Sequence, residues 1–234
     1  MKKIILNHKS YLLYDEIIKY KKDIEKIKTS DYEFIVFPQL IYLSLFNDCK
    51  YKVGSQDFYS SSMGSFTGEV NLESLNSLNV SYTMISQYER NKILGEDKNE
   101  SREKLYRSLN SKFNTLLCIG EDKRTNKPMY SIKNKLNYYL NNIDRTKLKR
   151  LSIIYEPSYS IRNANIKDIE YLTDLIKRIK NYCKSRYNIN VEVYYAGLIN
   201  EDNFKQIINI CDGVVLGKMS TDIKFIKSII KTSY

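Results

Sequence analysis

The stretch LSIIYEP, residues 151–157, and the segment behind it, residues 166–183, show the unit that decides the fold. The predicted strand, 151–156, is nearly continuously apolar, as expected for a parallel strand covered on both faces. In 166–183 the apolar residues recur at helical spacing on one stripe, namely Ile166, Ile169, Leu172, Ile176, Ile179 and Cys183. Asn165 stands where an N-cap would stand. A buried strand followed by an amphipathic helix is therefore predicted here.

The same unit recurs from end to end of the chain. The other predicted strands are KIILN (3–7), EFIVF (33–37), YKVGSQD (51–57), SYTMIS (81–86), TLLCIG (115–120), VEVYYA (191–196) and GVVLG (213–217). Helix-like segments lie between them, and no Pro- or Gly-rich linker or low-complexity tract interrupts the 234 residues. Eight strand–helix units without a boundary predict a closed (β/α)8 barrel rather than an open sheet.

The composition excludes several classes of protein. No apolar run approaches the roughly 20 residues of a membrane span, and MKKIILNHKS lacks the apolar stretch of a signal peptide, so we expect no membrane partner and a cytoplasmic location. The four cysteines are scattered, without CxxC spacing, and the chain has one His. This pattern predicts neither a metal site nor a disulfide framework, and it favours reduced, mostly buried thiols.

The net charge of +11 could indicate a nucleic-acid partner. The Lys and Arg residues are, however, spread over nearly every predicted helix, and no long basic tail is present. We therefore expect no nucleic-acid partner. A positive field would equally well steer a small phosphorylated substrate.

Polar residues at the carboxyl ends of the strands are the candidates for function, because barrel chemistry lies at that end. Asn7 and Lys9 follow the first strand on one side of the extended chain, whereas His8 points the other way. Glu156 ends the sixth strand. Gly197 and Gly217 end the last two and allow backbone N–H groups to approach a ligand. Taken alone, Lys9 is more often a solvated lysine and Glu156 a surface carboxylate.

Short motifs at these strand ends resemble the triosephosphate isomerase family in order and spacing. NHK (7–9) is similar to the family's N-W-K, VGSQD (53–57) with MGSFTGE (63–69) to G-A-Q-N and G-A-F-T-G-E, and SQYER (86–90) to G-H-S-E-R. CIGE (118–121), YEP (155–157), YAG (195–197) and DGVVLG (212–217) match as well. The resemblance covers essentially the whole chain. It implies an α/β fold that is a single TIM barrel, one domain over residues 1–234.

The resemblance also implies roles for individual residues. Glu156 would be the base that takes a proton from the carbon beside the carbonyl, and Lys9, with Asn7 beside it, would hold the phosphate and the enediolate. Glu89 would anchor the lysine, and Arg90 would hold its loop in place. Backbone N–H groups around Gly197 and Gly217 would cradle the phosphate.

The resemblance implies no cofactor and no metal. The implied substrate is a small phosphorylated sugar. The implied assembly is a homodimer through the loop around Phe66 and Thr67.

The sequence departs from the family at the electrophile. Gln87 occupies the position of the family's histidine, with Ser86 in place of a glycine and Tyr88 in place of a serine. A Gln amide can donate a hydrogen bond to a carbonyl or enediolate oxygen, but it cannot readily give up and regain a proton. Loss of one such donor costs on the order of 10²–10³ in rate.

Two further segments depart from the family: the lid, which is the loop after the base, and the phosphate cradle. Pro157 is followed by SYSIRNAN (158–165), which is shorter than the family's lid and lacks glycine. Leu198 replaces a serine and Lys218 a glycine, so Arg162 and Lys218 add positive charge near the expected phosphate.

Two hypotheses therefore remain open from the sequence. The first is an isomerase that interconverts dihydroxyacetone phosphate and glyceraldehyde 3-phosphate, or a close aldose–ketose phosphate pair, with Glu156, Lys9, Gln87 and Glu89 as catalytic residues. The second is a non-catalytic phosphometabolite-binding barrel that kept the fold and lost the chemistry.

Overall fold

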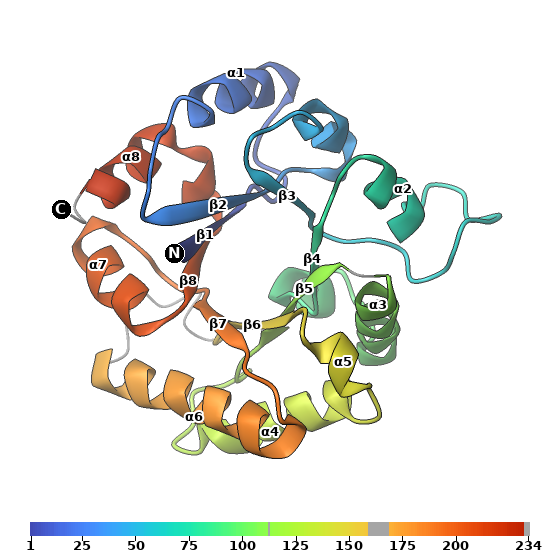
Figure 1. Cartoon of the computed structure of the whole chain (residues 1–234), viewed down its shortest axis with the longest axis vertical. Coiled ribbons are helices and arrows are strands. Elements are labelled where there is room, and N and C mark those ends of the chain that lie inside the picture. The colour runs from blue at the N-terminus through green and yellow to red at the C-terminus, as the bar shows by residue number, and fades with distance from the viewer. Residues whose placement is uncertain (112, 159–168, 232–234) are drawn as a thin grey trace.

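A computed structural model of the chain describes residues 1–111, 113–158 and 169–231. Its strands form one closed parallel barrel in sequence order (Figure 1). They are β1 (Lys2–Asn7), β2 (Tyr32–Phe37), β3 (Lys52–Ser55), β4 (Tyr82–Ile85), β5 (Asn114–Ile119), β6 (Leu151–Tyr155), β7 (Glu192–Tyr195) and β8 (Gly213–Leu216). β1 closes the barrel by pairing with both β2 and β8. The predicted fold class and all eight predicted strands are confirmed, with the third shorter than expected.

Helices surround the barrel and cover its outer face (Figure 1). They are α1 (Tyr14–Ile24), α2 (Leu72–Ser77), α3 (Lys98–Asn110), α4 (Pro128–Leu140), α5 (Arg145–Leu148), α6 (Ile169–Tyr187), α7 (Glu201–Ile210) and α8 (Ile223–Lys231). The predicted helix 166–183 is described from Ile169 and continues to Tyr187. Asn165, its expected cap, lies outside the described residues. After β2 the chain forms a 3₁₀ helix, η1 (Leu40–Phe46), instead of an α-helix.

The core has two layers because each strand is buried on both faces. Inside the barrel, side chains such as Ile5, Phe37 and Leu116 fill the space. Outside it, a larger cluster joins strands to helices and includes the α6 residues Leu172 and Ile179. The alternating unit of strand and amphipathic helix thus explains both layers.

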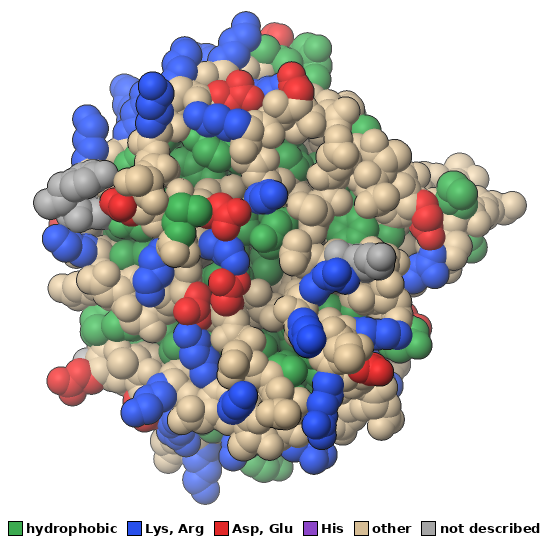
Figure 2. Space-filling model, viewed as in Figure 1, with side chains coloured by type: hydrophobic (Ala, Val, Ile, Leu, Met, Phe, Trp, Pro, Cys, Tyr) green, Lys and Arg blue, Asp and Glu red, His purple; other side chains and the backbone are tan. Residues whose placement is uncertain are grey.

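The molecular surface carries the charge in dispersed form. Figure 2 shows Lys and Arg side chains scattered over the visible face and interspersed with Asp and Glu. Within the described part of the chain, no helix is both long enough and apolar enough to cross a bilayer. Cys118, Cys183 and Cys211 are buried, Cys49 is half-buried, and all four are free thiols, as the sequence predicted.

Candidate active site

Lys9 is held at the mouth of the barrel by its backbone. It has a positive φ of 49°, a conformation that costs free energy for a residue with a side chain. Two contacts stabilise it: the Lys9 N–H donates to Asn7 Oδ1 at 3.1 Å, and Gln56 Nε2 donates to the Lys9 carbonyl at 3.0 Å. The resulting bend turns the Lys9 side chain into the mouth. His8 points the opposite way, as predicted, and is fully buried against Tyr20.

Glu89 supplies the countercharge for Lys9. The Lys9 ammonium group and the Glu89 carboxylate form an ion pair, which is the contact expected from the sequence. Glu89 begins η2 (Glu89–Ile93), a single turn of π-helix directly behind the end of β4. Irregular turns of this kind allow a short segment to present several polar side chains to one site.

Arg90 fixes that segment from behind, as the sequence predicted. Arg90 Nη2 lies 3.0 Å from Asp57 Oδ2, and Arg90 Nε lies 2.9 Å from Glu96 Oε2. The same two carboxylates pair with the buried Lys104, at 2.9 Å from Asp57 Oδ1 and 2.6 Å from Glu96 Oε2. Because charges removed from water must be paired, these four groups form a rigid unit that joins the ends of β3 and β4 to α3.

Glu156 follows β6 and is partly buried. Its Oε2 accepts a hydrogen bond from the Tyr88 backbone N–H at 3.2 Å. Burial, and then the nearby negative charge of Glu89, raise the pKa of Glu156 to about 7, although Tyr88 and Lys9 oppose the rise. A carboxylate with a pKa near neutrality is a competent general base at neutral pH. The chain directly after β5 packs against the Glu156 backbone, since a Cβ on Gly120 would lie 2.0 Å from the Glu156 carbonyl oxygen.

Gln87 is buried, and its side chain is already engaged. Gln87 Nε2 donates to the backbone carbonyl of Gln56 at 3.1 Å. Gln87 does not line the pocket that contains Lys9 and Glu156, nor the larger pocket that adjoins Glu156. The structure therefore places Gln87 at the barrel mouth with one amide N–H committed to the end of β3.

A pocket of about 330 Å³ joins the predicted substrate residues. The residues that line it include Asn7, Lys9, Glu156, Gly197, Leu198, Gly217 and Lys218. A Cβ on Gly217 would lie 3.4 Å from Lys9 Cε, so the backbone after β8 runs directly against the lysine. Leu198 is 42% exposed and η3 (Lys218–Thr221) begins at Lys218, so both side chains lie at the rim. Arg162 and the segment 159–168 lie outside the described residues.

Sequence reasoning missed the residues that support the site. Gln56 binds the backbone of both Lys9 and Phe37, the latter at 2.9 Å. Tyr155 donates its hydroxyl hydrogen to Glu121 Oε2 at 2.9 Å beneath the end of β6. Both contacts join different strands, and nothing local in the sequence reveals which strands will be neighbours at a given side chain.

The fold and the site define a class of protein: a (β/α)8 barrel with a carboxylate of near-neutral pKa and an ion-paired lysine around one pocket at the carboxyl ends of its strands. The model of a protein family described as Triosephosphate isomerase matches residues 2–233. The chain belongs to the triosephosphate isomerase family.

Individual relatives agree with this assignment. A protein named triosephosphate isomerase from Helicobacter acinonychis (strain Sheeba) is 32% identical over 219 residues, which is 90% of this chain and 90% of the relative. One from Orientia tsutsugamushi (strain Boryong) is 33% identical over 199 residues, or 80% and 77% of the two chains. One from Campylobacter concisus (strain 13826) is 32% identical over 174 residues, or 74% and 73%.

Proposed function

We propose that the protein interconverts dihydroxyacetone phosphate and glyceraldehyde 3-phosphate through an enediol. The observation that carries this function is the pocket in which Glu156 and Lys9 face the backbone at Gly197 and Gly217. Membership of an isomerase family supports it over the alternative of a non-catalytic barrel.

The chemistry follows from the charges in that pocket. Glu156 removes a proton from the carbon beside the carbonyl, for which its pKa of about 7 is suited. Lys9 stabilises the negative charge that develops on the substrate oxygen, and Glu89 keeps the ammonium group in place. Gln87 occupies the position of the family's electrophilic histidine, and its amide would have to turn into the pocket to donate a hydrogen bond to the substrate.

We assign the phosphate end of the substrate to the backbone N–H groups around Gly197 and Gly217, both of which line the pocket, and to the charge of Lys218 at its rim. Arg162 is a further candidate for this role from the sequence. The same field of Lys and Arg residues attracts a phosphorylated substrate from solution.

A homodimer is the assembly that best fits the exposed surface. The segment between β3 and α2 extends away from the barrel in Figure 1 and carries Phe66 and Thr67. Phe66 is 41% exposed and the nearby Met63 is 71% exposed, so two large apolar side chains project on one loop. Burial of this loop by a second copy would cover them. Free thiols in all four cysteines are in keeping with a cytoplasmic location.

A coupled assay with each triose phosphate tests the function. Purified wild-type protein should convert both substrates, and Glu156→Gln should reduce kcat by at least about 10³-fold, because the variant lacks a base. Exposed Glu103 on α3 offers a matched control, since Glu103→Gln removes a carboxylate remote from the pocket. Binding of triose phosphate without turnover by the wild type would support the non-catalytic barrel instead.

A further inference from the structure

Ser86, the residue between β4 and Gln87, has a left-handed backbone conformation. Its φ is 62°, a value that is uncommon for a residue with a side chain and costs free energy. Glycine adopts this conformation without the steric penalty, and the family motif that this segment resembles has a glycine here. A serine in this conformation persists only where the surrounding contacts stabilise it.

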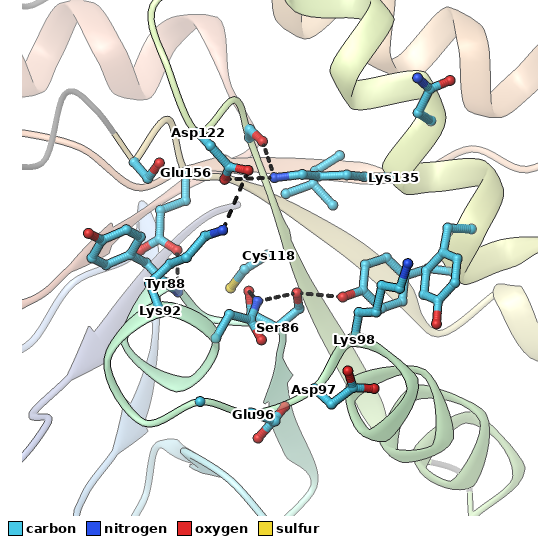
Figure 3. A pocket seen from close by; sticks show the side chains of 18 residues that line it. Ser86, Tyr88, Lys92, Glu96, Asp97, Lys98, Cys118, Asp122, Lys135 and Glu156 are labelled. Carbon is cyan, nitrogen blue, oxygen red and sulfur yellow. Dashed lines mark hydrogen bonds and ion pairs between the residues drawn. The ribbon is translucent and has the colours of Figure 1, made fainter.

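Two side chains provide such contacts. Asn91 Nδ2 donates to the Ser86 carbonyl oxygen at 3.1 Å and to Ser86 Oγ at 2.8 Å. The Tyr139 hydroxyl group lies 2.8 Å from the same Oγ, within hydrogen-bond distance. Figure 3 shows hydrogen bonds of Ser86 as dashed lines on either side of it, in the wall of the larger pocket, which has a volume of about 540 Å³ and adjoins Glu156. Both the main chain and the side chain of Ser86 are therefore fixed.

Asn91 and Tyr139 are themselves held by the surrounding helices. Tyr139 belongs to α4 and is buried. Ser101 Oγ, on α3, lies 3.3 Å from Asn91 Oδ1 and 2.6 Å from Glu96 Oε1. Glu96 belongs to the charged unit that joins the ends of β3 and β4 to α3. The turn at Ser86 is thus connected to two helices outside the barrel.

The two residues that follow Ser86 both belong to the active site. Gln87 occupies the position of the electrophile, and the Tyr88 backbone N–H donates to Glu156 Oε2 at 3.2 Å. The direction of that N–H is set by the backbone dihedral angles of the residues before it. A change of φ at Ser86 from positive to negative would therefore turn the Tyr88 N–H away from Glu156 and move Gln87.

We propose that Asn91 and Tyr139 are positioning residues that hold Ser86 in its left-handed conformation and thereby orient Gln87 and the Tyr88 N–H. The inference deepens the proposed isomerase function, and only its effect on turnover rests on that function. Placement matters at this point, since a displacement of about 1 Å in a catalytic group can cost on the order of 10²-fold in rate.

The amide proton of Tyr88 reports this geometry without turnover. In protein labelled with ¹⁵N-tyrosine, its NMR signal is identified by its loss in Tyr88→Phe. Because this N–H donates to a carboxylate, its chemical shift in the wild type should follow the titration of Glu156 near pH 7. Asn91→Ala should reduce the amplitude of this pH-dependent shift by about half or more, since a misaligned hydrogen bond weakens steeply.

Tyr139→Phe removes a single hydroxyl group and should reduce the same amplitude to a smaller degree. It keeps the proposal testable if Asn91→Ala fails to fold. Tyr138→Phe is the matched control, because the Tyr138 hydroxyl group also joins α4 to α3 but binds Asn99 Oδ1, at 2.6 Å. Asn134→Ala is the control for Asn91→Ala, since Asn134 lines the same pocket with an exposed side chain. Both controls should keep the wild-type amplitude.

Replacement of Ser86 by glycine separates positioning from a general loss of packing. Glycine accepts the positive φ without steric cost, so Ser86→Gly should make Asn91 largely dispensable. We expect Asn91→Ala to lower kcat/KM by about 10-fold or more in the wild type and by less than about 3-fold in Ser86→Gly. The pH-dependent shift of Tyr88 should recover in the double variant.

An equal loss from Asn91→Ala in the two backgrounds would overturn the proposal. So would a wild-type Tyr88 response in both Asn91→Ala and Tyr139→Phe. Failure of the isomerase function would appear as absent turnover in every protein while the Tyr88 signal still responds to the substitutions, so the two failures are distinguishable.

Discussion

The Lys9 ammonium group is paired with the carboxylate of Glu89, a residue 80 positions further along the chain. The pair connects the first strand to the fourth across the mouth of the barrel. Glu89 acts on both charged groups of the site, since it holds Lys9 and also raises the pKa of Glu156, after the larger effect of burial. One carboxylate thus orients the cation and strengthens the base.

Replacement of Glu89 should affect both groups. We expect Glu89→Gln to lower kcat/KM by about 10-fold or more, because a misplaced catalytic group of this kind costs up to about 10² in rate. The acid limb of the pH profile should also move to lower pH, as the repulsion of Glu156 is removed. Glu103→Gln provides the control for loss of a carboxylate. An unchanged acid limb in Glu89→Gln would show that Glu89 does not reach Glu156 electrostatically.

The ionised Glu156 should lower the free energy of unfolding at alkaline pH. Its pKa is raised from 4.5 to about 7, so the folded state binds this proton more tightly than the unfolded chain does. The resulting contribution to the free energy of unfolding is present at low pH and is lost as pH rises through 7. Glu156→Gln mimics the protonated form. We expect it to raise the free energy of unfolding by on the order of 2 kcal/mol at pH 8, with little gain at pH 4.5. Chemical denaturation at the two pH values gives the measurement; equal gains at both would contradict the prediction.

His8 should make the protein sensitive to acid. It is fully buried with both ring nitrogens unpartnered among the described residues, and burial lowers its pKa to about 3. Because the pKa of His8 is lowered, its contribution to stability is fully present above pH 6.5 and is lost progressively as pH falls towards 3. His8→Phe should remove this loss and stabilise the protein by about 2 kcal/mol more at pH 5 than at pH 8.

The His8 measurement is best made in a Glu156→Gln background, so that the opposite titration of Glu156 does not contribute. His8 is the only histidine in the chain, which makes the remaining histidine-linked slope attributable to it. A slope in His8→Phe equal to that of its parent would remove His8 as the cause.

Gln87 should limit the rate of proton transfer between the substrate oxygens. A neutral imidazole has one N–H donor, so in Gln87→His the ring can serve the substrate oxygens when that N–H faces the substrate and the hydrogen bond to the Gln56 carbonyl is given up. We expect kcat to rise by roughly ten-fold or more, a barrier reduction of about 1.4 kcal/mol. Gln87→Asn, which keeps an amide but shortens it, should lower kcat. An unchanged kcat in Gln87→His would place the slow step elsewhere.

Phe66 should be required for assembly. A carboxylate in its place cannot be buried unpaired, so Phe66→Asp should dissociate the proposed dimer at micromolar concentration. Sedimentation velocity measures the mass, and Tyr130 on α4, which is 72% exposed, offers the matched control Tyr130→Asp. A wild-type protein that sediments as a monomer would refute the dimer itself.

The repeated unit of strand and helix was sufficient to predict the barrel, because continuous apolar runs such as Ile153–Tyr155 leave no polar face for solvent. Strand-end residues followed from the same topology, and Lys9, Glu89 and Glu156 do lie near one another. The sequence could not show that Gln87 turns towards Gln56, since that depends on the backbone after β3. Nor could it show the larger pocket next to Glu156, because its walls come from four separate segments.

Gln56 connects the backbone around Lys9 to the loop proposed to form the dimer interface. Its side-chain amide holds the carbonyl groups of Lys9 and Phe37, its own carbonyl holds Gln87, and it stands just before the loop that carries Phe66. If a second copy orders that loop, it also orders the backbone around Lys9. Coupling between two binding events is reciprocal. If association of two protomers raises the affinity for substrate by some factor, substrate raises the affinity between the protomers by the same factor. Dilution would then lower activity by dissociating the dimer, and saturating substrate would oppose that dissociation.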